Sequence, residues 1–186
     1  LYFNLKIIKM LVGSIKEDTS LEKRVSMTPE SAKNLIGLGL KVCIEKNYAT
    51  HLGIHDNEYK NFGVEIKDSS KDVLNSSDLI IKVKEPQKSE WSLLRANQIL
   101  FTYLHLAADR EQARGLMMSG CTAIAYETVT DEQNGLPLLA PMSEVAGRLA
   151  VIEGAACLKT NSGGRGLLIS GVPGTQSAEV VIIGGG

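Results

Sequence analysis

The chain has 186 residues, of which 44% are hydrophobic and 22% are charged, an ordinary composition for a globular protein. This length suffices for one full domain and part of a second. The formal net charge of −1 argues against nucleic acid or an anionic membrane surface as a partner, because both attract a basic face. No apolar stretch approaches the roughly 20 residues that a membrane-spanning helix needs.

The first nine residues lack the long apolar core and the small-residue cleavage site of a signal peptide. We interpret residues 1–9 as a leader or a cloning remnant, with Met10 as the natural start. The three cysteines, Cys43, Cys121 and Cys157, lack C-x-x-C spacing. We expect them to be buried small hydrophobic residues in the reducing cytoplasm, and we predict no metal site.

Short apolar strands alternate with helical stretches, a pattern that predicts an α/β domain with a mostly parallel sheet and flanking helices. Thr28, Pro29 and Glu30 supply an N-cap, a proline at the first helical position and an acidic first turn, so a helix is expected from there to the glycines at 37–39. Asp56 is expected to cap a short helix that ends at Phe62. The predicted strands are 10–15, 41–45, 64–66, 79–83, 98–103 and 122–126.

The second half of the chain is predicted to be more helical. Residues 107–119 are predicted to form a helix that ends at Gly120, and a polar turn is expected at 131–135. A stretch rich in Ala, Glu and Leu predicts a long helix from Met142 to about Lys159. We place a boundary near 137–141, between a substrate domain of residues 10–138 and an incomplete second domain of 139–186 that begins with this linking helix.

The last seven residues are Val180-Val-Ile-Ile-Gly-Gly-Gly186. A continuous apolar run predicts a buried strand of a parallel sheet. A glycine turn after such a strand opens a Rossmann-type dinucleotide-binding unit, because the backbone there approaches a pyrophosphate. Gly184 and Gly186 are then the first two glycines of a G-x-G-x-x-G loop. The alternative is a buried strand with a flexible glycine end.

Two groups lie where predicted strands end, and open α/β sheets bind ligands at the carboxyl ends of their strands. Lys84 follows the strand 79–83, which Pro86 terminates, and the two-residue period places Lys82 on the same face. Lys84 is suited to hold a carboxylate or a carbonyl oxygen, and its alternative is a solvated lysine. His105 has apolar neighbours, so desolvation is expected to hold its pKa near or below ~6.5, suitable for proton transfer. A buried histidine satisfied by backbone is the alternative.

Arg24 closes a charged loop just before the first predicted helix. Its guanidinium is suited to grip a carboxylate through two parallel hydrogen bonds, and the alternative is a solvated surface charge. Together with Lys84 and His105, ahead of a nucleotide-binding strand, it predicts a site for a small anionic substrate beside a cofactor.

At these residues the chain resembles the alanine dehydrogenase family, which includes the first domain of nicotinamide nucleotide transhydrogenase. The resemblance runs in order from about Met10 to the last residue. The matching stretches are Arg24-Val-Ser-Met-Thr-Pro29, Ile81-Lys-Val-Lys-Glu-Pro86, Leu100-Phe-Thr-Tyr-Leu-His-Leu-Ala107, Ile124-Ala-Tyr-Glu-Thr-Val129, Leu136-Pro-Leu-Leu-Ala-Pro-Met-Ser-Glu-Val-Ala-Gly-Arg-Leu-Ala150, Gly163-Gly-Arg-Gly166 and Gly171-Val-Pro-Gly174.

The resemblance implies a role for each candidate residue. Arg24 corresponds to the arginine that binds the substrate carboxylate, Lys84 to the substrate lysine, and His105 to the general acid/base histidine. Ser143 corresponds to a serine that contacts the cofactor, beside Gly184 and Gly186.

The implied reaction is the reversible oxidative deamination of L-alanine to pyruvate and ammonia. NAD accepts the hydride, and the intact family enzyme is a homohexamer. Because the family's cofactor domain extends well beyond residue 186, we expect the chain as given to be inactive. The alternatives are a transhydrogenase alpha-type domain and a non-catalytic assembly fragment.

Overall fold

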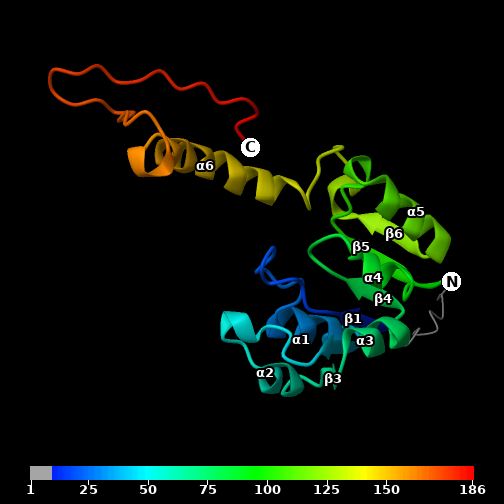
Figure 1. Ribbon diagram of the computed structural model, residues 1–186. Helices are drawn as coiled ribbons and strands as arrows, with labels where there is room; N and C mark the ends of the chain where they lie inside the picture. The colour runs from blue at the N-terminus through cyan, green and yellow to red at the C-terminus, as the bar shows by residue number, and fades with distance from the viewer. Residues whose placement is uncertain (1–9) are drawn as a thin grey trace. The chain divides into compact units, whose positions relative to one another are not determined.

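The computed structural model describes residues 10–186, which divide after Thr128 into two compact units. The first unit is a six-stranded sheet whose strands lie in the order β3-β2-β1-β4-β5-β6, and every neighbouring pair is parallel (Figure 1). The predicted α/β class with a parallel sheet is therefore confirmed. The strands are β1 (Leu11–Ser14), β2 (Lys41–Glu45), β3 (Glu65–Lys67), β4 (Leu79–Ile81), β5 (Ile99–Thr102) and β6 (Thr122–Ala125).

The strand order reverses between β1 and β4. In β1, Val12 is paired with Val42 of β2 on one side and with Leu79 of β4 on the other. Strands β2 and β3 follow β1 toward one edge of the sheet, and strands β5 and β6 follow β4 toward the other edge. In such sheets a crevice opens at the carboxyl ends of the two strands where the order reverses, and ligands bind there. The loops that follow β1 and β4 therefore border the expected ligand position.

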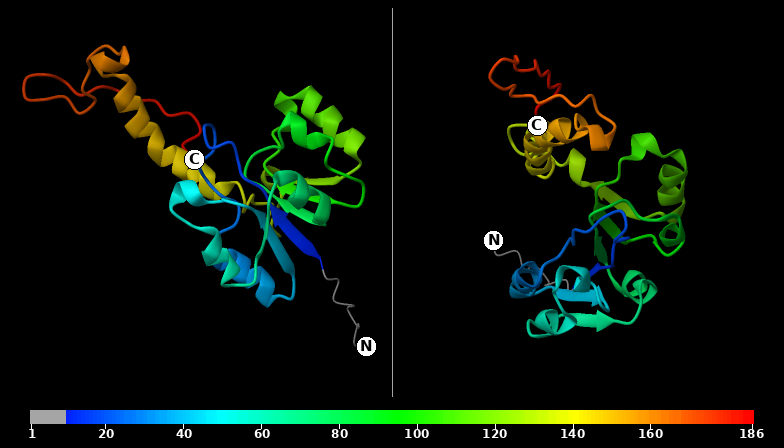
Figure 2. Two further views of the ribbon diagram at one scale, coloured as in Figure 1. Left: turned by 60° about the horizontal axis from the view of Figure 1, so that its bottom comes forward. Right: turned by 60° about the vertical axis from the view of Figure 1, so that its left-hand side comes forward.

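Helices cover both faces of this sheet (Figures 1 and 2). Successive side chains of one strand point to opposite faces, so Val42 and Ile44 lie in the core with helices α1 and α2, while Cys43 lies in the core with helices α3 and α5. Helices α3 and α4 had not been predicted. The helices of the first unit are α1 (Pro29–Gly37), α2 (Asp56–Lys60), α3 (Ser70–Ser76), α4 (Lys88–Trp91) and α5 (Arg110–Ser119).

Local capping explains where the predicted helices begin. Thr28 is the N-cap of α1 and Pro29 lies in its first turn, as the sequence predicted, and Thr28 and Ser31 also form a reciprocal capping box. The predicted cap at Asp56 is wrong: His55 is the N-cap of α2, and the Asp56 carboxylate instead accepts the backbone N–H of Asn47. Helix α5 begins three residues later than predicted, because residues 106–108 form a separate 3₁₀ turn.

The second unit contains α6 (Ala140–Cys157), which confirms the long helix. The predicted strand at 180–183 is wrong, since these residues form no strand and Ile183 is 97% exposed. A parallel strand needs a neighbouring strand for its backbone groups and a covering layer for its side chains. Among the described residues of this unit, the only β pairing is an isolated bridge between Val172 and Thr175.

The cysteines differ in burial, which corrects part of the expectation. Cys43 is buried and Cys121 is half-buried, but Cys157 at the end of α6 is exposed, because no residue of that helix is buried in this chain. Within residues 10–186 no helix is long and apolar enough to cross a membrane. The same residues contain no group of three or more metal-ligating side chains.

Candidate functional site

Arg24 binds the carboxylate of Glu22, and the positive charge of Lys84 also acts on that carboxylate. The guanidinium of Arg24 donates from Nε to Glu22 Oε1 at 2.9 Å and from Nη2 to Oε2 at 2.7 Å, a two-pronged contact. The pKa of Glu22 is below its ordinary value, mainly because of the Arg24 hydrogen bond and also because of the positive charge of Lys84. Two cations, from the loops after β1 and β4, thus act on one carboxylate.

His105 lies shortly after the end of β5, the strand that pairs with β4. Its Nδ1 is 3.3 Å from Oε2 of Glu85, the residue that follows Lys84 in the chain. The ring of Tyr103 stacks on the His105 ring, with 5.8 Å between centroids. The contact with Glu85 connects His105 with the segment that carries Lys84.

The prediction that His105 is buried among apolar side chains is wrong. Its side chain is 51% exposed, so the desolvation on which the expectation rested is absent. Its backbone is left-handed, with φ 46° and ψ 37°, at the start of the 3₁₀ turn that follows β5. The other two histidines, His51 and His55, are exposed.

Glu127, just after β6, fixes the backbone at the end of β5. Its carboxylate accepts the N–H groups of Leu104 at 3.1 Å and His105 at 2.7 Å. Burial alone raises the pKa of Glu127, but these backbone hydrogen bonds hold it below its ordinary value. A cavity of about 490 Å³ lies beside them, lined mainly by apolar side chains between Leu104 and Thr128. Arg24 and Lys84 are not part of its lining.

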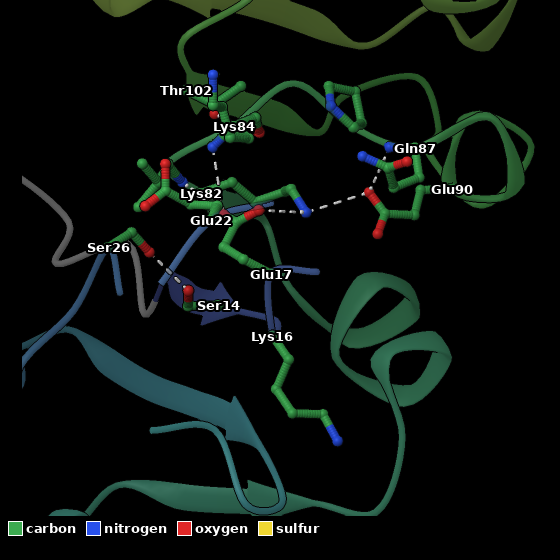
Figure 3. Close-up of polar contacts among 12 residues, drawn as sticks. Ser14, Lys16, Glu17, Glu22, Ser26, Lys82, Lys84, Gln87, Glu90 and Thr102 are labelled. Atoms are coloured by element: carbon green, nitrogen blue, oxygen red, sulfur yellow. Dashed lines mark hydrogen bonds and ion pairs between the residues drawn. The ribbon is translucent and has the colours of Figure 1, made fainter. Parts of the chain in front are cut away.

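Lys82 is buried, with 1% of its surface exposed, whereas Lys84 is half-buried. Strand β4 ends at Ile81, where the two-residue period stops. The Lys82 ammonium is 3.4 Å from Oε2 of Glu17 and 3.3 Å from Oε2 of Glu90 (Figure 3). Sequence reasoning missed this ion cluster.

The missed residues differ in how far the sequence could have indicated them. Glu17 and Glu85 follow β1 and β4 closely, so the same strand-end argument that selected Lys84 would have found them. Glu90 and Glu127 come from α4 and from the segment after β6, and only the packing of those segments brings them to the site.

In the second unit, the structure brings the three predicted cofactor residues together. Ser143, Gly184 and Gly186 line one cavity of about 390 Å³ beside α6. The glycines have left-handed backbones, with φ 96° at Gly184 and 92° at Gly186. A Cβ at Gly147 of α6 would overlap the carbonyl oxygen of Gly185, so this approach needs a residue without a side chain.

Comparison with known proteins decides the family. The N-terminal domain model of alanine dehydrogenase/PNT matches residues 13–146, and its C-terminal domain model matches residues 150–186. The chain belongs to the alanine dehydrogenase/PNT family. It is 48% identical over 177 residues to the alanine dehydrogenase of Methanococcus maripaludis and 46% identical to that of Mycobacterium tuberculosis. Each alignment covers 95% of this chain and 48% of the relative.

Solved structures of the family agree with the fold. An L-alanine dehydrogenase superposes with a TM-score of 0.79 at 45% identity, covering 90% of this chain and 46% of that one. A transhydrogenase from Sinorhizobium meliloti superposes with a TM-score of 0.67 at 26% identity, covering 78% of this chain and 44% of that one. The chain thus spans about half the length of the relatives it matches, and among these it is more similar to the alanine dehydrogenases.

Proposed function

We propose that this chain is the N-terminal part of an NAD-dependent alanine dehydrogenase, which reversibly converts L-alanine to pyruvate and ammonia. The observation that carries the proposal is that Arg24 and the charge of Lys84 act on one carboxylate, in the loops after β1 and β4 where the strand order reverses. His105, after the neighbouring strand β5, contacts Glu85, the residue that follows Lys84. The chain is 45–48% identical to several alanine dehydrogenases, which supports L-alanine as the substrate.

Each of the three residues has a role suited to its chemistry. Arg24 binds the substrate carboxylate through two parallel hydrogen bonds, as it now holds that of Glu22. Lys84 binds the oxygen that develops as pyruvate forms, because an ammonium stabilises negative charge there. His105 transfers protons while water adds to the substrate carbon and ammonia leaves. Its exposed ring and its contact with Glu85 suit it to exchange protons with a bound substrate.

The residues of the second unit fit a dinucleotide as far as this chain extends. The exposed backbone of Gly184 and Gly186 has no side chain to prevent the approach of a pyrophosphate, and Ser143 lines the same cavity. These residues would hold NAD, which supplies the acceptor for the hydride that leaves the alanine Cα.

The substrate half of the proposal is tested by titrating the isotope-labelled 186-residue chain with pyruvate and following its amide resonances. We expect saturable shifts near Arg24, Lys84 and His105, and an affinity that falls about tenfold or more in Arg24→Ala and Lys84→Ala, since each removes a charge-assisted contact. Arg110→Ala, on the exposed start of α5, is the matched control and should bind normally. A wild-type chain that shows no saturable response to pyruvate would contradict the proposal.

Two alternatives have their own signatures. A transhydrogenase-type domain would exchange hydride between NADH and an NAD analogue without responding to pyruvate and ammonia, and the 26% identity to such a protein keeps this candidate second. An assembly fragment would co-assemble with a partner regardless of replacements at Arg24 and Lys84.

For the intact enzyme we also propose a homohexamer, which light scattering would test. The buried thiol of Cys43 fits our proposal of a reducing, cytoplasmic location.

A further inference from the structure

Three charged side chains form an ion cluster beneath the proposed substrate site. The Lys82 ammonium contacts the carboxylates of Glu17 and Glu90, and the exposed fractions of the three side chains are 2%, 5% and 14%. Burial, which is the largest cause, raises the pKa of Glu90, although Lys82 acts against this. Removing charges from water costs free energy, so a buried cluster of this kind suggests a role besides stability.

The cluster is connected directly to the backbone of Lys84. Oε1 of Glu17 accepts the N–H of Val83 at 2.7 Å and the N–H of Lys84 at 3.3 Å. On the other side of the same residue, the hydroxyl of Thr102 donates to the carbonyl oxygen of Lys84 at 2.8 Å. The peptide groups on both sides of the Lys84 Cα are therefore held by side chains from β5 and from the loop after β1.

We propose that Lys82 is a positioning residue that acts through Glu17 to hold Lys84 in place for the substrate. This proposal rests on the proposed function, because it takes Lys84 to be the lysine that binds the substrate. Lys82 itself is buried and touches no substrate. Its ammonium keeps the Glu17 carboxylate beside the two N–H groups, and that carboxylate sets the backbone from which the Lys84 side chain extends.

The reason for a cation at this position is electrostatic. Two carboxylates this close and this deeply buried repel each other, and each would move toward water if Lys82 did not lie between them. Movement of Glu17 would release the N–H groups of Val83 and Lys84. Movement of Glu90 would release only the N–H of Gln87, at the start of α4.

This difference supplies a matched pair of variants. Glu17→Gln and Glu90→Gln make the same chemical change at the same ammonium, and both carboxylates also accept a backbone N–H. Only Glu17 is bonded to Lys84. A merely structural cluster predicts similar effects for both variants, whereas a positioning role predicts a larger effect for Glu17→Gln.

The experiment measures two quantities on the 186-residue chain: the hydrogen-exchange rates of the Val83 and Lys84 amides, and the dissociation constant for pyruvate. In Glu17→Gln we expect both amides to exchange about tenfold faster or more and pyruvate to bind about tenfold more weakly, the loss typical of one charge-assisted hydrogen bond. Glu90→Gln should change either quantity less than about twofold. Lys82→Met should resemble Glu17→Gln, and Lys82→Arg should restore part of the loss. If Lys82→Met does not fold, the comparison of Glu17→Gln with Glu90→Gln tests the proposal by itself.

Equal effects of Glu17→Gln and Glu90→Gln, or unchanged exchange at Lys84 in Glu17→Gln, would overturn the proposal. If the wild-type chain fails to bind pyruvate while exchange at Val83 and Lys84 still distinguishes the two variants, the proposed function fails and the positioning of Lys84 by Glu17 stands. The exchange measurement thus separates the two conclusions.

Discussion

The carboxylate of Glu127 accepts the backbone N–H of His105 at 2.7 Å, and His105 has a left-handed backbone with φ 46°. A residue with a side chain adopts this conformation only when its surroundings enforce it. Glu127 therefore holds His105 in a conformation that its own sequence does not favour.

Glu127→Ala should lower the free energy of unfolding by about 1–3 kcal/mol, because two N–H groups lose their acceptor. Glu85→Ala, which removes a contact to the exposed His105 ring and not to its backbone, should cost less than about 1 kcal/mol. Urea unfolding of both variants measures the difference. Equal losses of unfolding free energy in the two variants would show that the backbone contacts of Glu127 stabilise the fold no more than the contact of Glu85 with the His105 ring.

The Glu22–Arg24 pair predicts a pH dependence of stability. The pKa of Glu22 is lower in the folded than in the unfolded chain, chiefly because of the Arg24 hydrogen bond, so the unfolded chain binds more protons in that range. The stabilisation is complete above the unfolded value of about 4.3 and is lost as the pH falls through the folded pKa. Urea unfolding between pH 3 and 7 should show a smaller loss on acidification in Glu22→Gln than in wild type. The same change at the exposed Glu30 is the control, and identical curves for both variants would contradict the prediction.

Tyr48 fixes the loop that leads from Arg24 to α1. Its buried hydroxyl lies 2.8 Å from Oγ of Ser14 and accepts the N–H groups of Ser26 and Met27 at 3.0 and 3.2 Å. Tyr48→Phe leaves these groups without this partner and should cost about 1–3 kcal/mol of unfolding free energy. Tyr59→Phe removes a single hydrogen bond, to Met27 O, and should cost less in the same denaturation experiment. The reverse order would contradict the assignment.

Two glycines of α6 should respond oppositely to alanine. A methyl group at Gly154 would have no neighbour within 4 Å, so Gly154→Ala should stabilise the helix by up to about 1 kcal/mol. Gly147→Ala gains the same helix propensity but displaces the Gly185 carbonyl. Amide resonances of residues 184–186 should move in Gly147→Ala and stay in place in Gly154→Ala. If neither variant moves them, the glycine segment does not pack on α6.

The 186-residue polypeptide should not form NADH from L-alanine at alkaline pH, because hydride transfer needs a fixed nicotinamide and its residues 180–186 form no strand to hold one. A hybrid that joins this chain to the second half of the Methanococcus maripaludis enzyme should form NADH, and His105→Ala should slow it about 10²–10⁴-fold. Robust turnover by the 186-residue chain, or a fully active His105→Ala hybrid, would contradict these expectations.

Local sequence was enough to predict much of the fold. The capping box at Thr28, the proline after it and the glycine after α5 act through hydrogen bonds and backbone angles within a few residues. The apolar runs of β2 and β5 likewise reveal buried parallel strands. The end of a predicted strand selected Lys84 and a charged loop selected Arg24, and in the structure the charges of both residues act on Glu22.

Tertiary structure alone decided the environment of each charged group. Lys82 and Lys84 are two residues apart, yet one is buried between Glu17 and Glu90 and the other is half-buried above them. His105 has apolar neighbours in sequence but Glu85, Tyr103 and Glu127 around it in space. Burial and ion pairing depend on which distant segments pack together, and a local sequence pattern does not specify that packing. For the same reason the apolar run at 180–183 forms no strand here, because a strand in a parallel sheet exists only beside another.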